Sequence, residues 1–323
     1  MTGPTRAALR KLGRIIVAAA LAAVGSTIAA PFAYITNQGS NDVSVIDLAA
    51  RKVVATVAVG RAPAGIAVSS ATARAFVSNP ESKTLSVIDL KSNQVVDTLP
   101  AGDGPVGIAV SPDGSRVWLA DWFNNRMLVF DGTNHRLIAR VSVGAAPAGV
   151  VVHPDGKRVF VANRDSNTVS VIDADTLAVT GELPAGAHPF AVALDPAGSR
   201  LYVVNVWSND VTVFDTVSGA RLATVPVGRS PYGAAVDGEA GRVFVTNQHA
   251  DSVSVIDTRT HEVLATVPVG GYPEGIAVHG DRVYVVNWMD DNVAVMDART
   301  FEVLDTVATG KNSRGFGQFI GAP

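Results

Sequence analysis

The sequence predicts an all-β protein that folds as a seven-bladed β-propeller with four antiparallel strands in each blade. The prediction rests on a phrase that repeats seven times, on its near-constant period, and on the lack of any helical apolar periodicity within it. The phrase is a short apolar run, mostly β-branched, that closes on aspartate. The closing aspartates are Asp47, Asp89, Asp131, Asp173, Asp215, Asp257 and Asp297. They lie 42 residues apart five times and 40 residues apart once, and such a period indicates one supersecondary unit copied in series.

One unit, residues 228–270, illustrates the four strands. The expected strands are 234–236, 242–247, 253–257 and 263–269. Strands of about five residues separated by Gly, Pro, Asp and Asn turns are typical of a β-meander. Because both faces of these strands are apolar, the small sheets should stack face to face, as the blades of a propeller do.

The two ends of the repeat array predict how the ring closes. Residues 31–37 match the second strand of a unit, so residues 31–60 supply only three strands of their blade. Six complete units follow as far as residue 310, and residues 315–320 fall where another first strand belongs. We therefore expect residues 315–320 to join the strands of 31–60, complete blade 1 and close the ring. Closure removes exposed strand edges.

Residues 1–30 predict a secretory signal peptide. Four basic residues lie between Arg6 and Arg14, residues 15–24 are apolar, and residues 26–30 are small. An apolar run of ten residues is too short to span a bilayer, which takes roughly 20. We expect one domain, residues 31–323, that is periplasmic or secreted and has no transmembrane segment. An uncleaved amphipathic anchor is the alternative.

Charge and cysteine content narrow the classes of function. The chain has 26 basic and 29 acidic residues, and four of the basic ones precede residue 31. Residues 31–323 therefore carry 22 basic and 29 acidic residues, a net charge of −7. This balance is a poor match to a general binder of nucleic acid or anionic membranes. Because the chain has no cysteine, it has no disulfide and cannot hold haem through thioether bonds.

The second strand of each unit closes on asparagine, or once on aspartate, after an aromatic residue and two smaller ones. The closing residues are Asn37, Asn79, Asp121, Asn163, Asn205, Asn247 and Asn287. Over residues 31–320 this pattern resembles the YVTN-repeat β-propeller family of bacterial periplasmic and archaeal surface-layer proteins. Blade 3 departs from the pattern with Trp118 and Asp121. The resemblance implies the fold. It does not select a function, because related propellers include binding proteins, one of them similar to single-stranded DNA binders, and more distant lactonases, lyases and haem or quinone enzymes.

Residues that recur in every blade are predicted to serve the fold. We expect the aspartates that close the third strands to accept backbone N–H bonds in the following turn. The asparagines of the second strands, and Asp121, should fix the loop that follows them. A Gly-x-x-Pro-x-Gly phrase, as at residues 60–65, marks five of the crossings between blades, where proline stiffens the chain. Function should therefore lie where the blades differ.

The residues that break the repeat occur in two kinds of loop, which share one face of a propeller. One kind crosses from the fourth strand to the next blade, and the other joins the second and third strands. From these loops we predict a ligand-binding surface centred on blades 5–7. The predicted binding residues are Trp122, Arg164, His188, Phe190, Trp207, Arg229, Tyr232, His249, Tyr272, Glu274, Trp288 and Arg314. Loop aromatics favour recognition, and the alternative is that each ring packs down over its neighbouring blade.

These observations favour an exported, non-enzymatic binding or scaffold module. We expect a monomer that recognises an unidentified small molecule or protein and has no catalytic residue, metal or cofactor. The aromatic rings would stack a planar or extended ligand, and Arg164, Arg229 and Arg314 would supply charge for an anionic group.

Two other functions remain open. One is an enzyme of the lactonase or lyase type that uses His188, His249 and Glu274 as acid–base or metal-binding groups. The other is a binder of single-stranded nucleic acid through aromatic stacking, which the acidic balance disfavours. No Gly-x-Ser-x-Gly motif, phosphate loop or calcium loop is present.

Overall fold

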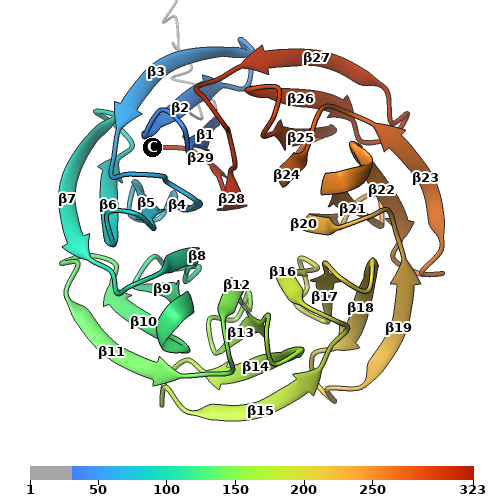
Figure 1. Ribbon diagram of the computed structural model, residues 1–323, viewed down its shortest axis with the longest axis horizontal. Coiled ribbons are helices and arrows are strands. Elements are labelled where there is room, and N and C mark those ends of the chain that lie inside the picture. Colours follow the sequence, from blue (N-terminus) through green and yellow to red (C-terminus); the bar gives the residue numbers. More distant parts are fainter. Residues whose placement is uncertain (1–30) are drawn as a thin grey trace, which may run out of the picture.

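The computed structural model describes residues 31–323, so the expected signal peptide lies outside the described residues. Strands β1–β29 form seven sheets arranged around a central axis (Figure 1). Six sheets have four strands, and the seventh gains a fifth strand from the C-terminal segment. Among the four strands of each blade every neighbouring pair is antiparallel, as in β12-β13-β14-β15. The predicted seven-bladed propeller is confirmed.

The strand boundaries repeat closely from blade to blade. Blades 1 and 2 contain β1 (Phe32–Asn37), β2 (Asp42–Asp47), β3 (Lys52–Ala58) and β29 (Ile320–Gly321), then β4 (Gly65–Ser69), β5 (Arg74–Asn79), β6 (Thr84–Asp89) and β7 (Gln94–Pro100). Blades 3 and 4 contain β8 (Pro105–Val110), β9 (Arg116–Asp121), β10 (Arg126–Asp131) and β11 (Leu137–Ser142), then β12 (Pro147–Val152), β13 (Arg158–Asn163), β14 (Thr168–Asp173) and β15 (Val179–Pro184). Blades 5 and 6 contain β16 (Pro189–Leu194), β17 (Arg200–Asn205), β18 (Asp210–Asp215) and β19 (Arg221–Pro226), then β20 (Pro231–Asp237), β21 (Arg242–Asn247), β22 (Ser252–Asp257) and β23 (Val263–Pro268). Blade 7 contains β24 (Pro273–His279), β25 (Arg282–Asn287), β26 (Asn292–Asp297) and β27 (Val303–Ala308). Short 3₁₀ turns η1 (Trp122–Asn124) and η2 (Gln248–Ala250) follow β9 and β21, and β28 (Phe316–Gln318) lies near the axis (Figure 1).

The core lies between neighbouring blades. Phe76 of blade 2 belongs to one buried cluster with Val117 and Phe130 of blade 3. In β17 the consecutive residues Leu201 and Tyr202 point to opposite faces of the sheet, and both are fully buried. Burial of both faces confirms that the blades stack face to face.

The aspartates that close the third strands have the predicted structural role. Oδ1 of Asp257 accepts the backbone N–H groups of Arg259 and Thr260, both at 2.8 Å. The same pair of bonds occurs in all seven blades. These aspartates therefore hold turns on the face away from the predicted site.

The second-strand asparagines fix the loop that follows, as predicted. Asn205 donates from Nδ2 to Asp210 Oδ1 at 2.6 Å and to Thr212 Oγ1 at 2.9 Å. In blade 3, Asp121 instead accepts the Nε–H of Arg126 at 2.8 Å and the N–H of Gly104 at 3.1 Å. The departure at Asp121 thus exchanges a donor for an acceptor and leaves the loop anchored.

An arginine that was not predicted to have a role stands at the start of the second strand in blades 2–7. Three of these arginines donate to backbone carbonyls of the next blade: Arg158 to Thr216, Arg200 to Thr258 and Arg242 to Ala298. They tie neighbouring blades together, so their recurrence serves the fold.

The C-terminal segment closes the ring. Ser313 forms a bridge with Asn37, and β29 pairs with β1 in the register Phe32↔Gly321 and Ala33↔Ile320. The N–H of Tyr34 donates to the carbonyl of Phe319 at 2.8 Å. The predicted joining of the chain ends is confirmed.

The closing strand also departs from the repeat, which the sequence analysis did not anticipate. In blade 4, three steps along β12, from Pro147 to Val150, oppose two steps along β13, so the bulge is one residue. In the closing strand, seven steps from Ser313 to Ile320 oppose four steps along β1, so the bulge is three residues. The bulged residues form β28, which pairs in parallel with the inner strand β4 and projects toward the axis (Figure 1).

No helix within residues 31–323 is long and apolar enough to cross a membrane.

Candidate functional site

The loops that carry the predicted site lie on one face of the ring, which we call the crossing face. In each blade the loop between the second and third strands is hydrogen-bonded to the loop that crosses between blades. Examples are Val206 N–H to His188 O at 2.9 Å and Trp288 N–H to Tyr272 O at 3.1 Å. We call the opposite face, which carries the turns between the first and second strands, the turn face. The twelve predicted residues fall into three groups on or beneath the crossing face.

The first group is buried on the axis. Phe190 and Tyr232 follow the proline at the crossings into blades 5 and 6 and are 8% and 6% exposed. Their ring centroids lie 4.4 Å apart, and Phe316 of β28 lies 4.9 Å from Phe190 and 5.7 Å from Tyr232. Blades 2 and 4 carry Ala64 and Ala148 at the same position. Large residues from one side of the ring and the bulge of the closing strand therefore fill the axis together.

An ion pair completes this group. The carboxylate of Glu274 is buried, and it accepts Arg314 Nε–H at 2.7 Å and Gln248 Nε2–H at 2.8 Å. Arg314 also donates to the hydroxyl of Tyr232. Burial raises the pKa of the Glu274 carboxyl, whereas the positive charge of Arg314 and the two hydrogen bonds act in the opposite direction. We call Phe190, Tyr232, Glu274, Arg314 and Phe316 the axial plug. We expected Arg314 to offer its charge to a ligand, but its guanidinium is engaged within the plug.

The second group is the Trp207 cluster, which comprises Trp122, Arg164, His188 and Trp207. The rings of His188 and Trp207 are stacked, with centroids 3.4 Å apart and an interplanar angle of 13°. The guanidinium carbon of Arg164 lies 5.3 Å from the Trp122 ring centroid and 5.9 Å from that of Trp207. Burial, and then the positive charge of Arg164, lower the pKa of His188. Trp207 is 65% exposed despite these contacts.

The third group is the Tyr272 cluster, which comprises Arg229, His249, Tyr272 and Trp288. His249 Nδ1 lies 2.9 Å from Ser230 Oγ, and His249 Nε2 lies 3.2 Å from the hydroxyl of Tyr272. Tyr272 lies 5.5 Å from Trp288 between ring centroids, and Arg229 donates to the carbonyl of His249 at 2.7 Å. Both imidazole nitrogens of His249 thus have partners within the protein.

The three residues named for an acid–base or metal site fall in three different groups. His188 belongs to the Trp207 cluster, His249 to the Tyr272 cluster and Glu274 to the axial plug. Both oxygens of Glu274 already accept hydrogen bonds. Across residues 31–323, no group of three or more His, Asp or Glu side chains is placed to hold a metal ion.

Sequence reasoning missed two exposed apolar residues on the crossing face. Phe123 and Met289 are 72% and 62% exposed. Each is the second residue after the closing residue of its second strand, the position that Trp207 occupies in blade 5. Alignment of the repeats could have found them, since this position is Gly, Glu, Asp or His in the other blades.

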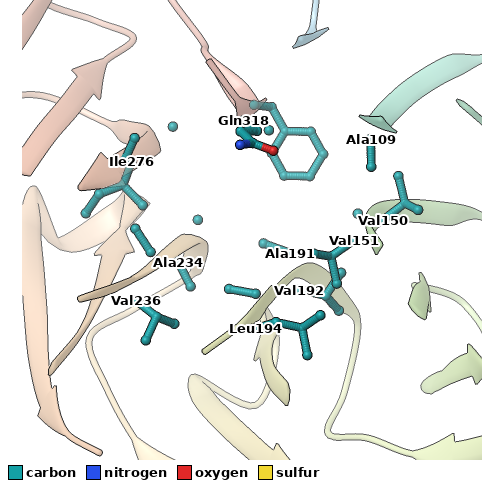
Figure 2. A pocket seen from close by; sticks show the side chains of 18 of the residues that line it. Ala109, Val150, Val151, Ala191, Val192, Leu194, Ala234, Val236, Ile276 and Gln318 are labelled. Atoms are coloured by element: carbon teal, nitrogen blue, oxygen red, sulfur yellow. The ribbon is translucent and has the colours of Figure 1, made fainter. Parts of the chain in front are cut away.

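A cavity of about 330 Å³ on the axis, which we call the axial cavity, was also not predicted from the sequence. It is lined by the inner strands β8, β12, β16, β20 and β24 together with β28. Figure 2 shows its mostly apolar walls and the amide of Gln318. The inner strands that line it recur in every blade, so nothing in the repeat pattern distinguishes it.

Seven four-stranded blades with YVTN-type second strands, closed by the C-terminal segment, define a repeat β-propeller. The family model described as YNCE-like beta-propeller matches residues 69–155 and 151–242, which together make up more than half of the chain. The chain belongs to the YNCE-like β-propeller family.

Solved structures confirm the fold across most of the chain. Hydrazine synthase of Kuenenia stuttgartiensis is 23% identical with a TM-score of 0.76, and the match covers 83% of this chain and 92% of that one. A functionally unknown protein of Desulfotomaculum acetoxidans is 17% identical with a TM-score of 0.78, covering 90% of this chain and 98% of the other. The dihydro-heme d1 dehydrogenase NirN, in complex with DHE, is 18% identical with a TM-score of 0.67, covering 86% of this chain and 63% of NirN. At these identities the likeness shows the fold alone. Comparison with curated proteins gave no match.

Proposed function

We propose that this protein is an exported, non-enzymatic binding propeller whose crossing face recognises a planar or extended ligand that carries an anionic group. The Trp207 cluster would supply the stacking surface. The single observation that carries the proposal is that Trp207 is held flat against His188 at 3.4 Å and still exposes 65% of its surface.

A stacking surface works best when its ring is already fixed before the ligand arrives. Trp207 is held by His188 on one side and lies near the guanidinium of Arg164. Its backbone N–H also donates to the carbonyl of Ala187 at 3.1 Å. A ligand that stacks on this ring therefore meets little entropic cost from ordering the protein, and stacking of a base on an aromatic ring contributes about 1–3 kcal/mol.

Positive charge lies beside this surface. Arg164 is paired with Asp165 at 2.8 Å, so part of its charge is compensated. Among residues 31–323, Arg229 has no carboxylate partner. The N–H of Ser230, next to Arg229, donates to Asn209 in the loop of Trp207 at 2.8 Å. Of the three arginines predicted to supply charge, Arg229 is therefore the one without a carboxylate partner, and we assign it the anionic group of the ligand.

Eight of the twelve predicted residues belong to the Trp207 and Tyr272 clusters and remain candidates for ligand contact. The other four belong to the axial plug. Export is supported by the composition of residues 1–30, and the domain by the closed ring of residues 31–323. The ligand is defined here by its chemistry, a flat apolar body with a negative group.

The experiment compares three probes that separate flatness from charge: AMP, adenosine and inorganic phosphate. Short oligothymidylate and FMN extend the set of planar anions. Binding is measured by isothermal titration calorimetry and by quenching of tryptophan fluorescence. We expect at least one planar anion to bind, with adenosine and phosphate each at least tenfold weaker.

Two variants locate the site. Trp207→Ala should weaken binding of that planar anion about tenfold or more and leave the melting temperature unchanged, because the ring is mostly exposed. Phe123→Ala, at the same loop position of blade 3 and similarly exposed, is the matched control and should bind as wild type. Failure of every planar anion to bind, or equal binding by Trp207→Ala, would overturn the proposal.

A further inference from the structure

The axial cavity is closed toward the crossing face. There the axial plug fills the ring with three aromatic side chains and one ion pair, and its side chains leave little surface exposed. Phe316 belongs both to the plug and to the lining of the cavity. A molecule on the crossing face therefore meets the plug and not the cavity.

The cavity is open toward the turn face. A hollow of about 360 Å³ beside the turns of blades 2–4 shares Val110, Val152 and Gln318 with it. A second hollow of about 500 Å³, beside the turns of blades 5–7, shares Val236 and Val278. The shared residues lie near the ends of the inner strands, so a ligand would enter from the turn face.

The walls of the cavity are apolar and uncharged. Its side chains include Val192, Leu194 and Ile276, and Gln318 is the single polar side chain among the residues that line it. Figure 2 shows the Gln318 amide in the cavity, across from these aliphatic groups. A charged ligand would lose hydration there and find no opposite charge, a large cost in a low-dielectric site.

Hydrogen-bonding groups are nevertheless present. Each inner strand from β8 to β24 ends its sheet, so one backbone edge faces the axis without a strand partner. The segment β28 already uses such an edge, because it pairs with β4. Gly317 allows this approach: it has φ +120°, and a Cβ there would lie 2.4 Å from the carbonyl oxygen of Ile66. Free N–H and C=O groups and the Gln318 amide can therefore meet one polar group of a ligand.

We propose that the axial cavity is a second binding site, specific for a small neutral molecule with an apolar body and one hydrogen-bonding group. The molecule enters from the turn face, lays its apolar body against the aliphatic wall and its inner end against Phe316, and exchanges a hydrogen bond with Gln318. A volume of about 330 Å³ lies at the lower end of the usual range for ligand pockets, about 300–1,000 Å³. This site is independent of the crossing face, because the axial plug separates the two.

The test uses n-heptanol as the neutral probe and heptanoate and heptylammonium as charged probes of the same length. Binding is followed by methyl NMR of Leu194 and Ile276. We expect saturable shifts with n-heptanol and at least tenfold weaker binding of both ions. No saturable shift at these methyl groups, or equal affinity for heptanoate, would overturn the proposal.

Three variants make the test specific. Ala234→Phe fills the cavity and should weaken n-heptanol binding at least tenfold, while Val217→Phe, at a position that is 86% exposed in an outer turn, should not. Gln318→Glu, at an exposed residue of the bulge, should reverse the preference from n-heptanol to heptylammonium; it tests the site even if Ala234→Phe fails to fold. Unchanged preference in Gln318→Glu would contradict the proposal.

Binding at the two proposed sites can be lost independently. Trp207→Ala should retain n-heptanol binding, and Ala234→Phe should retain binding of the planar anion at the crossing face. Loss of both ligands in either variant, with the fold intact, would contradict the separation by the axial plug.

Discussion

Phe319 should be the side chain that anchors the closing strand. β29 contains only two residues, so its few hydrogen bonds to β1 cannot hold the chain end alone. Phe319 is fully buried in a cluster that combines residues of blades 7, 1 and 2, including Tyr284, Tyr34 and Val68. We therefore expect the buried ring of Phe319 to contribute more to closure than the two-residue strand β29 does.

The magnitude follows from the burial. Phe319→Ala keeps the backbone carbonyl that accepts the Tyr34 N–H and removes only the ring. Truncating a fully buried phenylalanine costs about 3–5 kcal/mol, because the lost burial is added to the cavity that remains. We expect the free energy of unfolding to fall by that amount.

The assay is urea unfolding followed by far-UV circular dichroism and by tryptophan fluorescence on the same samples. Agreement of the two probes supports a two-state analysis. Phe123→Ala, at a 72% exposed phenylalanine, is the matched control and should change the free energy by less than about 0.5 kcal/mol. A loss below about 1 kcal/mol for Phe319→Ala would refute the anchoring role.

Three further predictions concern charge. Glu274→Ala should destabilise the fold by about 3–5 kcal/mol in urea unfolding, because it leaves Arg314 without its buried partner, and Glu274→Leu combined with Arg314→Met should recover most of that loss; no recovery would contradict a paired plug. The pKa of His188, measured by NMR titration, should lie below its usual value of about 6.5, so that stability falls as the pH drops through this range, and Arg164→Met should raise it; a pKa unaffected by Arg164→Met would remove the charge contribution. Backbone hydrogen bonds hold the pKa of Asp257 below its usual range, with side-chain contacts adding smaller effects, so its stabilising effect is present above about pH 4 and is lost on further acidification; urea unfolding between pH 5 and pH 2 should show a smaller pH dependence for Asp257→Asn, and an identical dependence would count against this role.

The fold could be predicted from the sequence because each blade repeats the same pattern of strand and turn residues. The asparagine at the end of β17 and the aspartate at the end of β22 have roles that depend on contacts within one blade. Equivalent residues recur at a nearly constant period because every blade makes the same contacts within itself and with its neighbour. The bulge of the closing strand is three residues long, whereas the bulge in the repeat is one residue long. The two additional residues have no counterpart in the repeat, so the pattern alone could not place β28.

The candidate site was harder to predict, for a related reason. Glu274 and Arg314 break the repeat, and we interpreted such breaks as signs of ligand contact. They meet each other only because ring closure brings blade 7 beside the chain end. A residue can thus depart from the repeat in order to fill the axis, and only the closed ring separates these residues from Trp207, which stays exposed.

The central claim is that the C-terminal segment is an integral strand of blade 1. Hydrogen exchange at the Tyr34 amide tests it directly, since this N–H donates to the carbonyl of Phe319 at 2.8 Å. We expect the Tyr34 amide to exchange as slowly as the amides of the buried second strands of other blades, such as that of Phe160. Exchange at the rate of an unpaired edge strand would contradict it.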